Sequence, residues 1–139
     1  MFDHCLYFNT TSLARLLERE WSLAFKAFDL SPPQAFLLRM VLNQPGILQH
    51  ELADALTIAR PTATRLLDKL QDRKLIDRRP SERDGRESEI HPTSAARAIE
   101  ASLNEASGSV TRRLKKRLGA DLFANTVDRM RDIRRTIAL

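Results

Sequence analysis

Two arginines, Arg60 and Arg65, bracket two threonines, Thr62 and Thr64, in one short segment of the chain. An arginine guanidinium can donate two hydrogen bonds to O6 and N7 of a guanine, and a threonine can donate to a base or a phosphate. On a helix, Arg65 points outward because its apolar neighbours lie inward, and the first half of such a helix can read base pairs in a major groove. The alternative is that Arg65 contacts only phosphate or solvent.

A second cationic group, Arg83 and Arg86, flanks Asp84-Gly85 between two short extended segments. An Asp-Gly pair in this setting is typical of a β-hairpin turn. A hairpin can carry an arginine into a narrow minor groove, whose negative potential attracts cations. Acidic residues interleave with these arginines, so a solvated loop of mixed charge is the alternative.

The excess positive charge of the chain is concentrated around these two groups. The 139 residues include 23 lysines and arginines against 18 acidic residues, which gives a net charge of +5. Segment 60–86 alone holds nine cations and five anions. This balance favours a polyanionic partner, of which nucleic acid is the commonest. A basic protein without such a partner is the alternative.

Apolar spacing, capping residues and turn signals predict the elements that must position these groups. Ser31-Pro32-Pro33-Gln34 is a strong helix start, because Ser31 and Gln34 can form a capping box and proline is tolerated in the first turn. Thr93 can cap a long helix, and Gly119 fits the position after its end. In chain order, we expect a helix over about 10–28, a helix from 31, a short strand at 47–48, a helix over about 49–56, a helix over about 60–73, strands at 75–79 and 87–91, and two final helices.

This order is that of a mostly α, winged helix-turn-helix fold with a small β-hairpin wing and additional N- and C-terminal dimerisation helices. We expect a single domain over 1–139, with a DNA-binding lobe over about 30–93. The helical dimerisation region covers about 1–29 and 94–139. Hydrophobic residues make up 42% of the chain, which supports a folded core. The alternative for the terminal helices is that they pair within a monomer.

Five segments of the chain form a recognisable set: Ser31-Pro32-Pro33-Gln34-Ala35-Phe36, Gly46-Ile47-Leu48-Gln49-His50-Glu51-Leu52-Ala53, Thr62-Ala63-Thr64-Arg65-Leu66-Leu67-Asp68-Lys69-Leu70, Leu75-Ile76-Asp77-Arg78-Arg79 and Arg83-Asp84-Gly85-Arg86. Together they resemble the MarR family of bacterial regulators, and length and helix order match along nearly the whole chain. Several positions depart from the family pattern, among them the run His91-Pro92-Thr93-Ser94-Ala95-Ala96. Lys74 stands where a glycine often closes the recognition helix, and Ala59 stands where a serine cap is common.

The resemblance implies a sequence-specific transcriptional regulator, expected to be a ligand-responsive repressor that binds a pseudo-palindromic operator in double-stranded DNA as a homodimer. Asp84 is expected to stabilise the wing by pairing with an arginine. Lys69 and Arg73 are expected to contact phosphates or to be solvated helix charges. Gln49 and His50, at the start of the preceding helix, are expected at a phosphate. For His50, an ordinary exposed histidine is the alternative. The residues expected at DNA are Gln49, His50, Arg60, Pro61, Thr62, Thr64, Arg65, Lys69, Arg83 and Arg86.

Two kinds of switch are compatible with the resemblance. Relatives respond to small aromatic ligands, and a pocket for one is expected among Trp21, Phe25, Phe28, Phe36 and Met40. The alternative is that these residues are core. Some relatives sense organic peroxides through a cysteine near the start of the first helix, so Cys5 makes a thiol-based sensor an alternative function. An inert thiol is the other interpretation of Cys5.

Other classes of function are less well supported. The sequence shows no glycine loop that cradles phosphates and no nucleophile motif, and its three histidines lack metal-ligand spacing, so we expect no enzyme, no cofactor and no metal. One cysteine, no signal peptide and no long apolar run favour the cytoplasm and no membrane contact. A winged-helix protein-interaction module that does not bind DNA remains an alternative. RNA ranks low because its major groove is too narrow for a helix.

Overall fold

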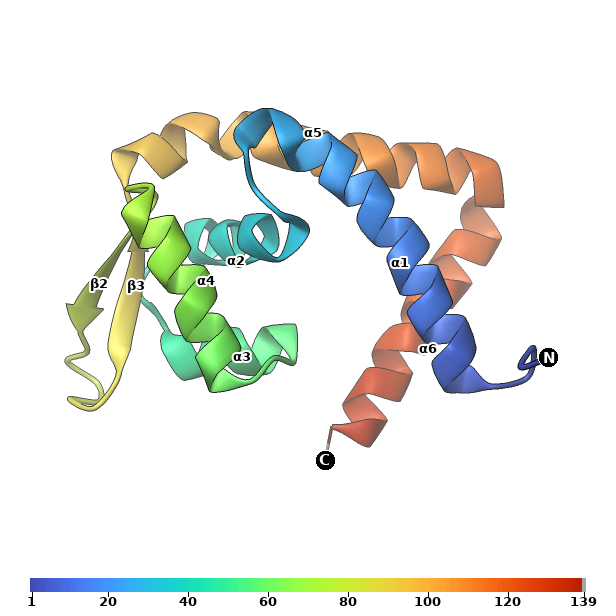
Figure 1. Ribbon diagram of the computed structural model, residues 1–139, viewed down its shortest axis with the longest axis horizontal. Helices are drawn as coiled ribbons and strands as arrows, with labels where there is room; N and C mark the ends of the chain where they lie inside the picture. Colours follow the sequence, from blue (N-terminus) through green and yellow to red (C-terminus); the bar gives the residue numbers. More distant parts are fainter. Residues whose placement is uncertain (139) are drawn as a thin grey trace.

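The computed structural model describes residues 1–138 and is mostly helical with one small sheet, which confirms the expected fold class. The predicted domain boundary at residue 139 lies outside the described residues. Figure 1 shows α2, α3, α4 and the strands gathered at one end of the long helix α5, with α6 at its other end. The elements are α1 (Leu6–Phe25), the 3-10 helix η1 (Lys26–Phe28), α2 (Pro32–Asn43), β1 (Ile47–Leu48), α3 (Gln49–Leu56), α4 (Arg60–Asp72), β2 (Ile76–Pro80), β3 (Ser88–Pro92), α5 (Ser94–Leu118) and α6 (Ala120–Ile137).

The strand β3 is the centre of a three-stranded antiparallel sheet with the order β1-β3-β2. Ile90 of β3 lies opposite both Ile47 of β1 and Arg78 of β2, and its side chain is fully buried. Gly46 precedes β1 with a φ of +86°, and its N–H donates to the carbonyl of Ile90 at 2.8 Å. The predicted hairpin is present, with each strand displaced by one residue from the expected range.

The helix α4 is held in the lobe by its inner face. Ala63, Leu67 and Leu70 are each 0% exposed, and the two leucines belong to a core that includes Leu37 of α2 and Leu52 of α3. Burial of a leucine side chain stabilises a fold by about 1.5–3 kcal/mol. Because one face of α4 is fixed in this way, its opposite face is presented outward.

The first helix begins earlier than the sequence predicts. It starts at Leu6, with Cys5 as its N-cap, and the expectation of a start near residue 10 was wrong. Its first turns are exposed, so they lack the inward-facing residues from which the helix was predicted. At the other end Asp29, with a φ of 53°, terminates η1 in a left-handed conformation.

The turns around the lobe follow their local sequence. Ser31 and Gln34 form the expected capping box, and Thr93 Oγ1 accepts from the N–H of Ala96 at 3.2 Å. Ala59 makes no side-chain cap at the start of α4. Lys74 adopts the left-handed conformation, with a φ of 59°, at the position where the family often has glycine.

The middle of α5 is tied to both α1 and α2 through Ser107, which is 5% exposed. Its Oγ accepts from Trp21 Nε1 at 3.0 Å and from Arg39 Nη1 at 2.9 Å, while Arg39 Nε donates to Asn104 Oδ1 at 2.8 Å. Burial lowers the pKa of the Arg39 guanidinium. Gly108 follows Ser107 inside the helix.

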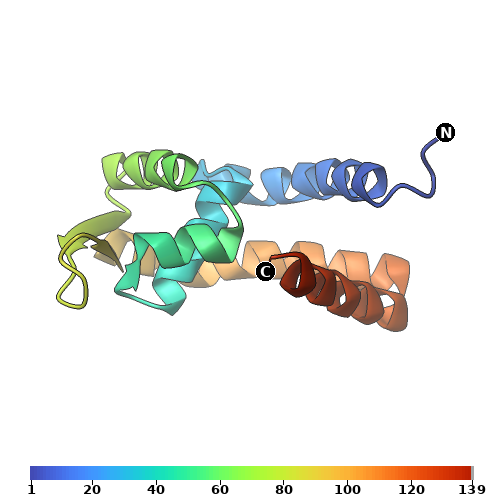
Figure 2. The same ribbon diagram turned by 90° about the horizontal axis from the view of Figure 1, so that it is seen from below.

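The terminal helices leave large apolar side chains uncovered. Although α1 and α6 overlap in Figure 1, Figure 2 shows them well apart, so they do not cover each other. No residue of α6 is buried. Among residues 1–138, no helix combines the length and apolar character that crossing a membrane requires. The exposed apolar residues of α1 and α6 are Leu6, Tyr7, Phe8, Leu13, Leu16, Leu23, Leu122, Val127, Met130, Ile133 and Ile137.

Candidate nucleic-acid interface

The outer face of α4 carries Arg65 in an exposed position on the first half of the helix. Its Nη2 donates to Thr62 Oγ1 at 3.2 Å, so the guanidinium lies along the helix toward its N-terminus. Pro61 and Thr64 are exposed on the same half. This helix start therefore presents a cation and hydroxyl groups to the outside, as a helix that enters a groove requires.

The first residue of α3 holds the start of α4. Gln49 Nε2 donates to Thr64 Oγ1 at 2.7 Å, and that hydroxyl donates to the carbonyl of Arg60 at 3.1 Å. The N-terminal ends of the two helices consequently lie side by side. Gln49 is the first residue of α3, at the helix start where it was expected. Its side-chain amide already donates a hydrogen bond within the chain.

One carboxylate, Glu87, joins the wing to both helices. Its Oε1 accepts from Arg60 Nη2 at 2.9 Å and lies 3.3 Å from His50 Nδ1. The Glu87 side chain is 12% exposed, whereas that of Arg60 is 69% exposed. The sequence analysis missed Glu87 as an organising residue, because the contact joins residues that are 27 positions apart.

The loop between β2 and β3 is built on hydrogen bonds to its own backbone. Ser81 is buried, and its Oγ accepts from the N–H groups of Arg83 and Asp84, each at 3.1 Å. Asp84 Oδ1 accepts from the N–H of Arg86 at 3.0 Å and lies 3.8 Å from Arg86 Nε. The Arg86 side chain is nevertheless 96% exposed, so it is free to reach beyond the wing.

The two wing arginines differ in where they point. Arg83 Nη1 lies 3.6 Å from Glu51 Oε1 of α3, and its Nη2 donates to the carbonyl of Gly46 at 3.5 Å. Arg83 therefore folds back toward β1 and α3, whereas Arg86 extends outward. A minor-groove contact remains a prediction for both, and the geometry favours Arg86.

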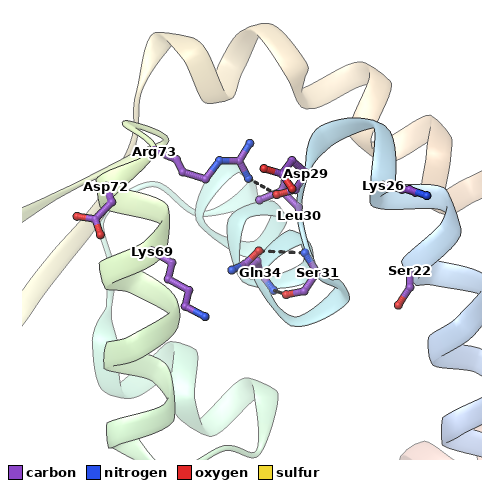
Figure 3. A pocket seen from close by; sticks show the side chains of 9 residues that line it. All are labelled: Ser22, Lys26, Asp29, Leu30, Ser31, Gln34, Lys69, Asp72 and Arg73. Carbon is purple, nitrogen blue, oxygen red and sulfur yellow. Dashed lines mark hydrogen bonds between the residues drawn. The ribbon is translucent and has the colours of Figure 1, made fainter.

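A third arginine, which the sequence analysis did not single out as a site residue, fixes β2 to α4. Arg78 Nη2 donates to Asp68 Oδ1 at 2.7 Å and to the carbonyl of Thr64 at 3.3 Å. Lys69 is exposed and lines a cleft of about 540 Å³ between α4 and the start of α2, where Figure 3 shows its side chain directed into the cleft. Lys69 thus lies on the side of α4 that faces α2 and η1.

The residues predicted for a ligand pocket and for redox sensing lie away from this interface. Phe25 is fully buried and contacts Phe36 edge to face, and Trp21, Phe28 and Met40 pack against the same core. None of these five lines the cleft in Figure 3, whose lining is mostly polar and charged. Cys5 is exposed at the start of α1. The structure does not test either prediction.

The fold and this surface define a winged helix-turn-helix protein. Residues 28–87 match a family model described as MarR family. A relative from Bacillus subtilis (strain 168), described as the uncharacterized HTH-type transcriptional regulator YybA, is 30% identical over 87 residues. These residues are 63% of this chain, and they span 58% of the relative's length.

Solved structures share the whole fold at low identity. The S. aureus MepR–DNA complex gives a TM-score of 0.82 at 19% identity, and covers 95% of this chain and 97% of that one. The reduced form of MarR from E. coli gives a TM-score of 0.75 at 22% identity, and the match covers 92% of this chain and 95% of that one. The transcriptional regulator SlyA gives a TM-score of 0.84 at 19% identity, and the match covers 96% of this chain and 94% of that one.

Segment 28–87 of the chain matches the MarR family, and the fold along nearly the whole chain is shared with solved structures of winged helix-turn-helix regulators. The family resemblance seen in the sequence is thereby confirmed. The expectation that the chain is not an enzyme also agrees with its similarity to transcriptional regulators.

Proposed function

We propose that this protein is a transcriptional regulator that binds double-stranded DNA in a sequence-specific way as a homodimer. The observation that carries the proposal is the joint placement of the exposed first half of α4 and the extended Arg86 beside it on the wing. Arg65 on α4 reads bases in the major groove, and Arg86 contacts the adjacent minor groove or its phosphates.

Cations that lack an acidic partner within hydrogen-bond distance are the natural phosphate contacts. Arg65 and Lys69 form no ion pair among the described residues, and Arg86 only a loose one with Asp84. Arg60 and Arg83 are instead held by carboxylates of this chain. Arg65, Lys69 and Arg86 therefore contribute binding energy, whereas Arg60 and Arg83 hold the interface in its shape.

The exposed apolar faces of α1 and α6 support the homodimer. A second copy of the chain would cover Leu122, Val127, Met130 and Ile133 without requiring another protein. Two copies of α4 would then face successive major grooves, about 34–36 Å apart, which predicts a pseudo-palindromic operator.

Selection of preferred sequences from a random duplex pool tests the proposal. Arg65→Ala should weaken binding by about 1–3 kcal/mol and relax selectivity at one base position, because it removes a base contact. Arg86→Ala should reduce the slope of log K against log salt by about 0.9 for each lost phosphate contact. Arg117→Ala, in the last turn of α5, is the matched control.

Two results would contradict DNA binding. Wild-type protein that ignores every duplex at low ionic strength would favour the protein-interaction module, and so would binding that is insensitive to salt. Arg65→Ala and Arg86→Ala would then behave like Arg117→Ala.

Repression and a response to a small aromatic ligand stay predictions, as does a cytoplasmic location. Repeating the selection with aromatic acids and with organic peroxide tests the two switches. Loss of the peroxide response in Cys5→Ser would identify the thiol as the sensor, and an unchanged response would exclude it.

A further inference from the structure

Arg73, directly after α4, holds the end of the first helical segment. Its Nη2 donates to the carbonyl of Phe28 at 2.7 Å, and its Nη1 donates to the carbonyl of Asp29. Figure 3 shows the guanidinium reaching across the cleft edge to Asp29. Carbonyl groups at a helix end lack helical partners and carry partial negative charge, so a two-pronged cation suits them.

The same end of α4 is also fastened to α5. The carbonyl of Lys74 accepts from Thr93 Oγ1 at 2.7 Å, and the carbonyl of Leu75 accepts from the Thr93 N–H at 3.1 Å. Thr93 is the N-cap of α5. Three consecutive residues after α4, Arg73, Lys74 and Leu75, therefore bind the end of η1 and the start of α5, which lead to the two terminal helical regions.

The hydrogen bonds of Arg73 run from a cationic guanidinium to uncharged backbone carbonyls, and among residues 1–138 Arg73 forms no ion pair. Its position 44 residues from Asp29 in sequence makes this a tertiary clamp and not a local cap. The clamp fixes the C-terminal end of α4 relative to α1, whereas the N-terminal half that faces DNA stays free of it.

We propose that Arg73 is a positioning residue that sets the separation of the two half-sites which the dimer accepts. The inference rests on the proposed function, because it requires a homodimer on DNA. In a two-fold dimer built on the terminal helices, the placement of α4 relative to α1 and α5 determines the distance and angle between the two copies of α4. Without the clamp, the lobe that carries α4 loses its hydrogen bonds to the end of η1, so the orientation of the whole lobe relative to α1 is less restricted.

The experiment measures the affinity of Arg73→Met for duplexes that carry two selected half-sites moved one base pair at a time. Each added base pair shifts one half-site by about 3.4 Å and turns it by about 35°. Wild type should prefer one spacing strongly. In Arg73→Met the preference for that spacing should fall by about fivefold or more, while affinity for a single half-site stays near the wild-type value.

Two controls separate positioning from loss of charge and loss of folding. Lys26→Met removes a cation from the same cleft without touching the clamp and should keep the wild-type preference. Thr93→Ala should broaden the preference as Arg73→Met does, because it removes the hydroxyl that binds Lys74, whereas Thr93→Ser should not.

An unchanged spacing preference in a dimeric Arg73→Met would overturn the inference. Equal loss of affinity at every spacing would also overturn it, because that is the signature of a phosphate contact. A monomeric Arg73→Met would show that the arginine acts on the subunit contact instead. Wild-type protein that binds no duplex would refute the proposed function itself. Binding by the wild type alone therefore distinguishes this failure from failure of the inference about Arg73.

Discussion

Arg60 and His50 share a single carboxylate oxygen of Glu87. At the surface of a DNA-binding protein, an anion in this position does what a phosphate would do: it accepts hydrogen bonds from the cationic groups that face the duplex. Glu87 also restrains the wing against α4. Under the proposed function, Glu87 therefore weakens non-specific attraction to DNA and holds the interface in one shape.

Glu87→Gln should increase affinity for unrelated duplex several-fold and should steepen the salt slope by up to about one. Glutamine keeps the size of the side chain and can still accept from Arg60, but it removes the negative charge. The measurement is a salt titration of binding to a random duplex.

Glu89→Gln is the matched control for this experiment. Glu89 lies on the neighbouring strand and accepts from His91 Nε2 at 3.1 Å, a hydrogen bond that lowers the pKa of its carboxyl group. It should leave the salt slope close to that of wild type. Weaker binding in Glu87→Gln would show that the carboxylate serves only to orient Arg60.

At the scale of elements, the turn after α4 contains a lysine in a conformation that favours glycine. Lys74 has a φ of 59°, and a left-handed conformation costs a non-glycine residue roughly 1–2 kcal/mol. Its carbonyl is the acceptor for Thr93, so the turn is retained despite this cost.

Lys74→Gly should raise the free energy of unfolding by about 1 kcal/mol, because glycine adopts this conformation without strain. Urea denaturation measures the change. Lys69→Gly, inside α4, should instead lower the unfolding free energy by about 1 kcal/mol. A decrease for Lys74→Gly would contradict the strain assigned to this turn.

Local chemistry explains which elements could be predicted from sequence. The capping box at Ser31 and the cap at Thr93 depend on residues within three positions of each other, and both are present in the structure. The turn at Lys74 was expected from the family resemblance, because relatives often have a glycine at this position. The start of α1 was not predicted, since its apolar residues are exposed and lie outside the core formed by the described residues.

The candidate site was predictable as a set of residue types but not as a set of contacts. Spacing alone places Arg65 outward on α4 and Arg86 on the wing. It cannot show that Arg83 turns back to Glu51 or that Arg73 reaches Asp29, because these contacts join distant segments and depend on side-chain direction. Three carboxylates, Glu51, Asp68 and Glu87, organise the interface.

At the scale of the whole molecule, the uncovered apolar faces of α1 and α6 support the proposed homodimer. Stable protein–protein interfaces bury about 1,200–2,000 Å² in total, and the apolar residues of α1 and α6 extend along both helices. Ile133, which is 40% exposed, lies on this face of α6.

Ile133→Asp should convert the dimer into a monomer and should abolish the preference for two half-sites, because a charge buried without a partner is costly. Light scattering coupled to size-exclusion chromatography measures the mass. Asn125→Asp adds the same charge at an exposed polar position of the helix and should remain dimeric. If wild-type protein is itself monomeric, the dimeric proposal is refuted.

The long helix α5 carries Ser107, Gly108 and Ser109 at its middle, a sequence typical of points where helices bend. Trp21 of α1 and Arg39 of α2 both donate a hydrogen bond to the Ser107 hydroxyl. Hydrogen bonds from α1 and α2 therefore stiffen α5 at this point. In the proposed dimer, any change that loosens α1 or α2 therefore also makes the connection between the two copies of α4 more flexible.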